Sequence, residues 1–161
     1  MKKLILLSIL FSSGTWANTQ YKATSECEFD YDGFKFCSKS NIVKYKKALT
    51  SQKPNFDSNY ILLNIGTPKN IRYVAIDSKN GLVYPLSDEI IGFKDDNGGL
   101  TGKPPVINYS IDNANLCIKG SVMAYRNSYD NVKVCYSVQN NEHSKYKKEF
   151  IRADFPENIE D

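Results

Sequence analysis

The chain has 161 residues, of which 41% are hydrophobic and 24% charged, and its formal net charge is +3 at pH 7. This length fits one domain. The nearly balanced charge argues against a dedicated nucleic-acid-binding protein, because such domains carry a strong basic excess. No stretch of the sequence is apolar over the roughly 20 residues that a membrane-spanning helix needs. The composition therefore predicts a globular protein with no membrane span and no nucleic acid as a partner.

Residues 1–17 have the pattern of a secretory signal peptide. Two lysines precede the apolar stretch 4–11, and the segment ends in small residues at Ala17. We predict cleavage after Ala17, which leaves residues 18–161 as a single globular domain in the periplasm or outside the cell. The leader holds two of the 21 basic residues and none of the 18 acidic ones, so the mature net charge is +1. It also holds Trp16, the single tryptophan.

The four cysteines all lie after the predicted cleavage site. In an oxidising compartment an even number of cysteines favours disulfides. Their spacing lacks the close pairs that a zinc site needs, and we predict no metal and no cofactor. Of the three possible pairings, we predict two disulfides, Cys27–Cys37 across a hairpin and Cys117–Cys135 between neighbouring strands.

The first element predicted after the leader is a hairpin over residues 26–37, because Asp32 and Gly33 lie between alternating aromatic residues. A three-residue loop places Gly33 in the left-handed conformation and Cys27 opposite Cys37. A two-residue loop instead places Glu28 opposite Cys37.

A short helix is predicted over residues 40–49. Ile42, Tyr45 and Leu49 fall on one helical face, and Ser40 or Asn41 could cap its beginning.

From Tyr60 onward the pattern changes to short strands joined by polar turns. Strands are predicted over residues 60–65, 71–77, 82–86, 106–112, 116–126 and 132–138. A long loop over 92–105 interrupts them, a turn is predicted over 127–131, and the residues after Gln139 form a polar tail. This pattern predicts the α+β class dominated by strands, with one antiparallel sheet and one short N-terminal helix.

Alternation separates two faces on the predicted strands that carry the last two cysteines. The apolar residues of both strands fall on one face, whereas each cysteine shares the other face with a lysine, Cys117 with Lys119 and Cys135 with Lys133. Both cysteines therefore lie on the more polar face, which allows them to meet.

No catalytic residue is predicted. A serine or cysteine nucleophile needs a base, most often histidine, and the single histidine, His143, lies in a polar stretch. Carboxylates in or near the long loop, at 88, 89, 95 and 96, leave one enzymatic alternative open, because a glycosidase needs two carboxyl groups roughly 5–10 Å apart.

Two segments are candidates for contact with a protein partner, because loops on a rigid sheet commonly carry recognition. The long loop has glycines that let it reach outward, and the turn over 127–131 combines a tyrosine with neighbouring charges, as interface hot spots do. The predicted contact residues are Lys94, Asp95, Asp96 and Lys103 in the loop, and Arg126, Tyr129 and Asp130 in or beside the turn.

The stretch 55–63 followed by 74–84 resembles a pattern found in small uncharacterised secreted bacterial proteins. In that group F-x-x-x-Y-x-L, here beginning at Phe56, precedes I-I-D-x-x-T-G-x-V-Y, here containing Asp77. The chain departs from the pattern at Asn80, where threonine is usual. The resemblance implies a strand, a turn and a strand in an exported protein, and it implies no activity.

Together these features predict an exported, non-enzymatic binding protein in the periplasm. Its most concrete form is an inhibitor or immunity-type protein directed at a cell-wall hydrolase or a delivered toxin, so that its partner is another protein of the cell envelope. The alternatives are a carboxylate-dependent envelope enzyme and a structural or adhesive surface subunit. No oligomeric state is predicted.

Overall fold

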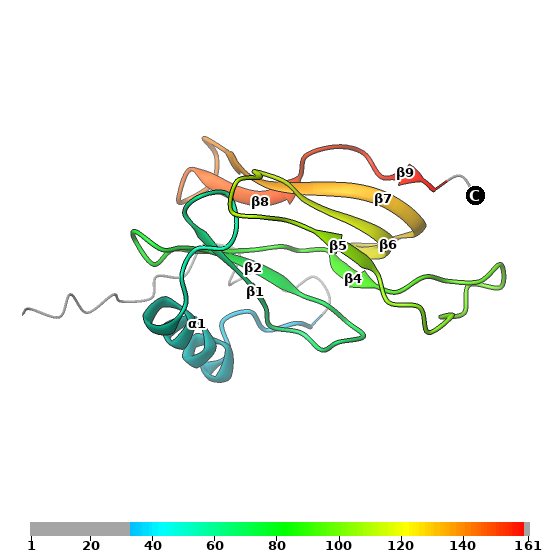
Figure 1. The fold of residues 1–161 in the computed structure, drawn as a ribbon, viewed down its shortest axis with the longest axis horizontal. Helices are drawn as coiled ribbons and strands as arrows, with labels where there is room; N and C mark the ends of the chain where they lie inside the picture. Colours follow the sequence, from blue (N-terminus) through cyan, green and yellow to red (C-terminus); the bar gives the residue numbers. More distant parts are fainter. Residues whose placement is uncertain (1–32, 160–161) are drawn as a thin grey trace, which may run out of the picture.

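The computed structural model describes residues 33–159, which form one helix and nine strands (Figure 1). The elements in chain order are α1 (Lys39–Ser51), β1 (Tyr60–Asn64), β2 (Tyr73–Asp77), β3 (Val83–Pro85), β4 (Glu89–Ile91), β5 (Val106–Asn108), β6 (Leu116–Ala124), β7 (Asn127–Asn140), β8 (Lys148–Arg152) and β9 (Glu157–Asn158). All strand pairs between these elements are antiparallel. The predicted class, strand-dominated with one short helix, is confirmed. Within the described residues, no helix has the length and apolar character to span a membrane.

The strands form two sheets, so the prediction of a single sheet is wrong. Strands β1, β2 and β3 make a three-stranded sheet, and β4, β6, β7 and β8 lie in that order in a larger sheet, to which β5 and β9 add at β6 and β7. The physical reason lies in β2, which is buried at all five positions and therefore needs cover on both faces. Helix α1 packs against one face of the small sheet and the larger sheet covers the other (Figure 1).

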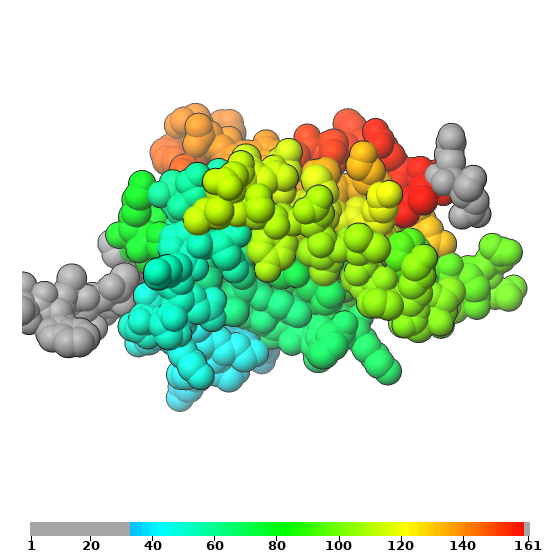
Figure 2. Space-filling view, in the orientation of Figure 1, coloured from blue at the N-terminus to red at the C-terminus, as the bar shows by residue number. Residues whose placement is uncertain are grey.

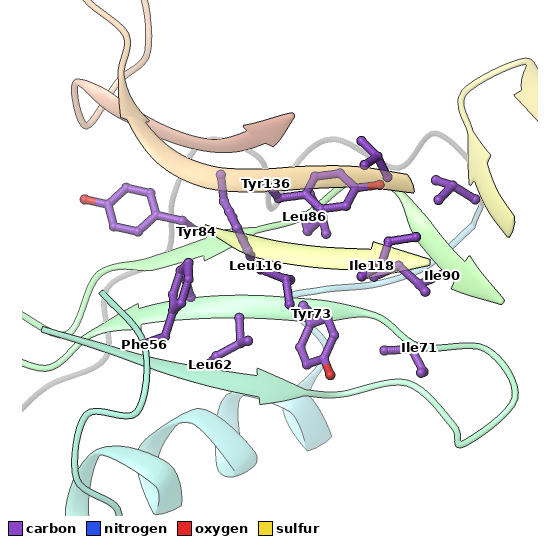
Figure 3. Packing of buried hydrophobic residues seen from close by; sticks show 14 of the residues in the cluster. Phe56, Leu62, Ile71, Tyr73, Tyr84, Leu86, Ile90, Leu116, Ile118 and Tyr136 are labelled. Carbon is purple, nitrogen blue, oxygen red and sulfur yellow. The ribbon is translucent and has the colours of Figure 1, made fainter. Parts of the chain in front are cut away.

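The main core lies between the two sheets (Figure 3). Along β2, Tyr73 and Ala75 face the larger sheet, whereas Val74 and Ile76 face the helix. This alternation follows from the two-residue period of a strand. Apolar side chains of β6 and β7 fill the core from the other side, as the sequence predicted, among them Leu116, Ile118, Val132, Val134 and Tyr136.

The segment before helix α1 is a turn rather than the second strand of the predicted hairpin. Gly33 has a φ of +82°, the left-handed conformation predicted for it, but residues 34–37 form no strand. The chain enters the helix through Ser38, whose hydroxyl oxygen accepts a hydrogen bond from the backbone N–H of Asn41 (3.3 Å). The first half of the predicted hairpin, with Cys27, lies outside the described residues.

The buried face of helix α1 differs by part of a turn from the predicted one. Asn41, Tyr45 and Ala48 are buried, whereas Ile42 and Leu49 are only partly so. The asparagine is tolerated there because its side-chain N–H donates to a backbone carbonyl just before the helix (3.0 Å). Packing against the small sheet, and not the apolar pattern alone, therefore sets the rotation of the helix.

The predicted turn over 127–131 is the beginning of the long strand β7. The chain reverses two residues earlier, at Tyr125 and Arg126, where Ala124 pairs with Asn127 and Arg126 has a φ of +62°. The polar residues that resemble a turn lie on the solvent-exposed end of this hairpin. The residues after Gln139 are likewise not a free tail, because strand β8 pairs with β7 and buries Phe150.

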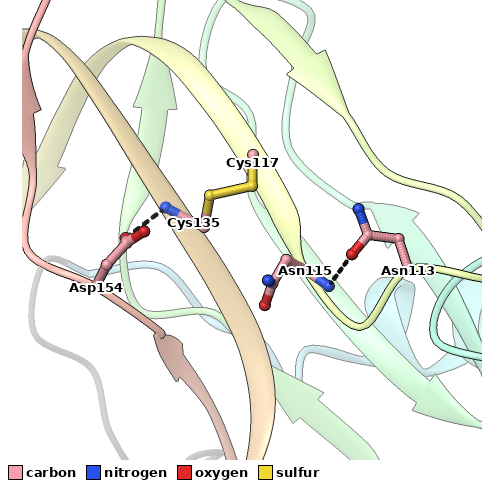
Figure 4. The surroundings of a disulfide bond; sticks show 5 residues. All are labelled: Asn113, Asn115, Cys117, Cys135 and Asp154. Atoms are coloured by element: carbon pink, nitrogen blue, oxygen red, sulfur yellow. Dashed lines mark hydrogen bonds between the residues drawn. A yellow bond between two sulfur atoms is a disulfide. The ribbon is translucent and has the colours of Figure 1, made fainter.

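Cys117 and Cys135 form a disulfide across facing positions of β6 and β7, which confirms that pairing (Figure 4). The Asp154 carboxylate accepts a hydrogen bond from the backbone N–H of Cys135 (2.8 Å). This is the one disulfide that the structure describes between described residues, and none of the described cysteines is a free thiol. The predicted Cys27–Cys37 pair involves a residue outside the described part and stays a prediction.

Candidate functional site

The long loop over residues 92–105, hereafter the projecting loop, is folded into an irregular hairpin. The backbone N–H of Phe93 donates to the carbonyl of Lys103 (3.0 Å), and that of Thr101 donates to the carbonyl of Phe93 (2.9 Å). An isolated bridge between Lys94 and Leu100 continues the hairpin toward its tip. The loop stands out from the body at the right of Figures 1 and 2, and residues 95–104 are exposed. Its backbone is therefore ordered by its own hydrogen bonds.

One of the two predicted aspartates at the tip has a structural role. The Asp95 carboxylate accepts hydrogen bonds from the backbone N–H groups of Asn97 and Gly99, both at 2.9 Å. Gly98 between them has a φ of +78°, a conformation that favours glycine. Asp96 is exposed and makes no hydrogen bond or ion pair with another described residue. Of this pair, only Asp96 is available to a partner.

The base of the projecting loop is attached to strand β7. The Asn131 side chain accepts from the backbone N–H of Lys94 (2.9 Å) and donates to its carbonyl (2.8 Å). The Lys94 ammonium lies 2.6 Å from the Asp130 carboxylate and donates to the hydroxyl of Ser128 (3.1 Å). Lys94 and Asp130, predicted in two separate segments, are thus partners of each other.

The ion pair perturbs the titration of Asp130. Hydrogen bonds from Lys94 and from Ser128 hold the pKa of the Asp130 carboxyl below its ordinary value of 3.8. The carboxylate is therefore charged, and bound to Lys94, throughout the neutral range. This contact brings the two predicted segments together into one surface.

At the end of the β6–β7 hairpin, Arg126 is exposed and its guanidinium lies over the Tyr125 ring, 4.7 Å from the centroid. A groove of about 390 Å³ runs beside this hairpin, with the Arg72–Glu89 ion pair (2.6 Å) in its wall. Tyr125 was not predicted as a contact residue, although it is 48% exposed. Its tyrosine–arginine neighbourhood in the sequence was the signal that could have identified it.

Tyr129 lies further along β7 and is only partly exposed. Its ring packs against the main core, and the Arg152 guanidinium covers it at 4.8 Å from the centroid. Arg152 is in turn bound to the buried carboxylate of Asp88 (2.7 Å). Replacing Tyr129 would therefore disturb the fold as well as any contact, which makes Arg126 the cleaner residue to test.

The carboxylates of the enzymatic alternative are mostly engaged within the protein. Asp88 is buried and accepts hydrogen bonds from Arg152 and from the hydroxyl of Tyr136 (3.1 Å). Burial, and then the Asp88 charge, raise the pKa of that Tyr136 hydroxyl well above its ordinary value. Glu89 is paired with Arg72.

His143 lies in the exposed turn before β8. The described residues hold no group of three side chains that could bind a metal ion.

Lys103 belongs to a second hollow, which lies at the base of the projecting loop. Its ammonium lies 4.5 Å from the centroid of the Phe93 ring. The hollow has a volume of about 360 Å³, and its wall is formed by Phe93, Lys103, Val106, Lys119, Asn131 and Ile159. Lys119 was placed on the polar face of its strand from the sequence but was not recognised as a site residue.

No family model, curated protein or solved structure matches this chain.

Proposed function

We propose that this protein is an exported, non-enzymatic binding protein that acts in the periplasm or outside the cell by inhibiting a cell-wall hydrolase or a delivered toxin. Export rests on the leader-like residues 1–17 and agrees with a disulfide at Cys117–Cys135. The partner is another protein of the cell envelope.

The observation that carries the proposal is the projecting loop, which is long, exposed and yet held in one conformation. Its base is attached to β7 through Lys94, Asn131 and Asp130, and its tip is closed by Asp95. A loop ordered before binding loses little conformational entropy on association. This is the property that an inhibitor needs if it is to fill the cleft of an enzyme.

The side chains left free on the loop suit such a contact. Leu100 is 57% exposed, and Asp96 is exposed near the tip of the same loop. An apolar side chain that enters a pocket of the partner supplies binding free energy, and a neighbouring charge adds specificity. We therefore assign the first contact to Leu100 and Asp96, with Arg126 on the adjacent hairpin.

The test is a turbidity assay of purified peptidoglycan with a panel of hydrolases, namely hen egg-white lysozyme, an N-acetylmuramoyl-L-alanine amidase and an endopeptidase. We expect the purified mature protein to inhibit one of them at a stoichiometric ratio. We also expect it to release nothing from peptidoglycan by itself. Hydrolysis by the protein alone that disappears in Asp96→Asn would instead support the carboxylate-dependent enzyme.

A matched pair of variants locates the contact. Leu100→Ala should weaken inhibition about tenfold, which corresponds to about 1.4 kcal/mol. Val43→Ala, on the exposed side of α1, removes a comparably exposed apolar side chain (65% exposed) on a different part of the surface and should change nothing. Equal inhibition by both variants would place the contact elsewhere.

A further inference from the structure

Two lysines lie side by side on the outer face of the larger sheet. Lys119 on β6 and Lys133 on β7 are directly opposite in the register and both are exposed. Like charges at facing positions of an antiparallel pair destabilise a sheet. Within residues 33–159 neither ammonium has an ion pair, although Glu157 of β9 faces Lys133 from the other side. Glu157 offsets part of the repulsion from the side of Lys133, but Lys119 has no ion pair with a described residue, so the facing lysines still carry a local cost to the fold.

A third lysine approaches from the projecting loop. Lys103 and Lys119 both line the hollow of about 360 Å³ at the loop base. Val106, which is 53% exposed and faces Lys119 across the β5–β6 pair, contributes an apolar wall, and Ile159 contributes another. The hollow thus combines positive charge with apolar surface, and it is large enough for one or two side chains of a partner.

We propose that this hollow, with Lys103, Lys119 and Lys133, binds an acidic polypeptide segment of the partner protein. A carboxylate of the segment lies between Lys119 and Lys133, and an apolar side chain next to it packs on Val106. The inference deepens the proposed function, on which it rests, because it gives the chemistry of the partner's surface. The carboxylate removes the repulsion between the two ammonium groups, so that binding relieves a cost already present in the free protein.

A protein segment fits this hollow better than a nucleic acid does. Binding of a single strand uses open aromatic faces for stacking, but Lys103 covers a face of the Phe93 ring. A phosphate polymer also needs a long basic track, whereas Lys103, Lys119 and Lys133 form a short basic patch at one place. Three lysines at one place beside apolar walls match a short acidic-apolar sequence.

The experiment measures binding of a synthetic peptide, acetylated and amidated, with the sequence Glu-Leu-Glu-Glu-Leu-Glu, to the full mature protein by NMR titration. A peptide with glutamine at every glutamate position is the matched probe. We expect the glutamate peptide to shift the signals of Lys103, Lys119 and Lys133, and the glutamine peptide to bind at least tenfold more weakly. Binding should also weaken as the salt concentration rises.

The double variant Lys119→Gln/Lys133→Gln should bind the glutamate peptide at least tenfold more weakly. Its melting temperature should change little, because the loss of facing like charges offsets the loss of the exposed, facing Lys133–Glu157 pair. The control is Lys46→Gln/Lys47→Gln, which removes the same charge from the exposed side of α1 and should leave peptide binding unchanged.

Three results would overturn the inference: equal binding of the two peptides, an unchanged affinity in the Lys119/Lys133 variant, or tighter binding of a thymidine hexanucleotide than of the glutamate peptide. The inhibition assay separates this inference from the proposed function. If the Lys119→Gln/Lys133→Gln variant inhibits a hydrolase normally while Leu100→Ala does not, the inference of an acidic-segment site is wrong and the proposal of an inhibitor is retained. If the peptide binds as expected and no hydrolase is inhibited, the proposal of an inhibitor is wrong and the inference of an acidic-segment site is retained without it.

Discussion

Lys94 and Asp130 form the ion pair that ties the projecting loop to strand β7. The lysine side chain is only 14% exposed, whereas the aspartate is 46% exposed. An ion pair that reaches solvent contributes little to stability, commonly under about 1 kcal/mol. Its importance here is positional, since it orients the loop base together with the two hydrogen bonds between the Lys94 backbone and the Asn131 side chain.

The Asp130 carboxyl should titrate with a lowered pKa in the native protein. Because the folded-state pKa lies below 3.8, the contribution of the pair to stability is fully present above the unfolded-state pKa and is lost as the pH falls through the folded-state value. NMR titration of the carboxyl carbon should show this low pKa in the native protein. In Lys94→Gln the pKa should rise toward 3.8, and an unchanged value would show that Lys94 is not the cause.

At the scale of elements, the projecting loop owes its order to side chains as much as to backbone pairing. Asp95 provides the acceptor for two backbone N–H groups at the tip, as aspartate commonly does in turns. Neither N–H has a strand partner. The carboxylate therefore adds to the backbone hydrogen bonds of Asp95 with Gly98 (2.9 Å) and with Gly99 (2.8 Å) in ordering the tip.

Asp95→Ala should accordingly loosen the tip without unfolding the protein. Amide hydrogen exchange at Asn97 and Gly99 should become at least tenfold faster, since both donors lose their acceptor. The melting temperature should stay the same within about 2 °C, because the tip is outside the core. Asp96→Ala, which changes the adjacent exposed carboxylate, is the control and should leave exchange at both residues as it was.

At the scale of the whole molecule, strand β8 closes the core. Phe150 is 2% exposed, and its ring centroid lies 5.9 Å from that of Phe56, across the two sheets. A parallel bridge between Leu86 and Phe150 joins β8 to the residue after β3. The charged C-terminal region is therefore part of the packed two-sheet structure.

Phe150→Ala should lower the free energy of unfolding by about 3–5 kcal/mol, because it leaves a cavity in a packed core. Phe155→Ala is a well-matched control, since Phe155 is 92% exposed and its loss should change stability by less than about 0.5 kcal/mol. Urea denaturation of the two variants measures the difference. Similar stabilities would show that β8 is not part of the cooperative unit.

The predicted export also concerns the whole chain. If the leader is removed after Ala17, the mature protein begins at Asn18 and contains no tryptophan. Mass spectrometry of the protein from the periplasm or the medium should find this N-terminus, and its fluorescence should be that of tyrosine. An intact Met1 terminus on the exported protein would refute the cleavage.

The sequence by itself determined what depends on neighbouring residues. Alternation placed Cys117 and Cys135 on the more polar faces of their strands, which allowed the pairing that we predicted. Because antiparallel partners advance in opposite directions, the same register puts Lys119 opposite Lys133. The predicted disulfide therefore already implied that the two lysines face each other, although they were not recognised as a site.

Only the tertiary structure decided what depends on residues far apart in the chain. The Lys94 contact with Asp130 joins residues 36 positions apart, and no local periodicity encodes it. The sequence of strand β8 resembles a charged tail, because Phe150 is the single deeply buried side chain that attaches this strand to the core. The division into two sheets follows from burial of β2 on both faces. The apolar run of residues 73–76 permits this burial, but the same run also fits a strand in a single sheet, so the sequence alone does not distinguish the two arrangements.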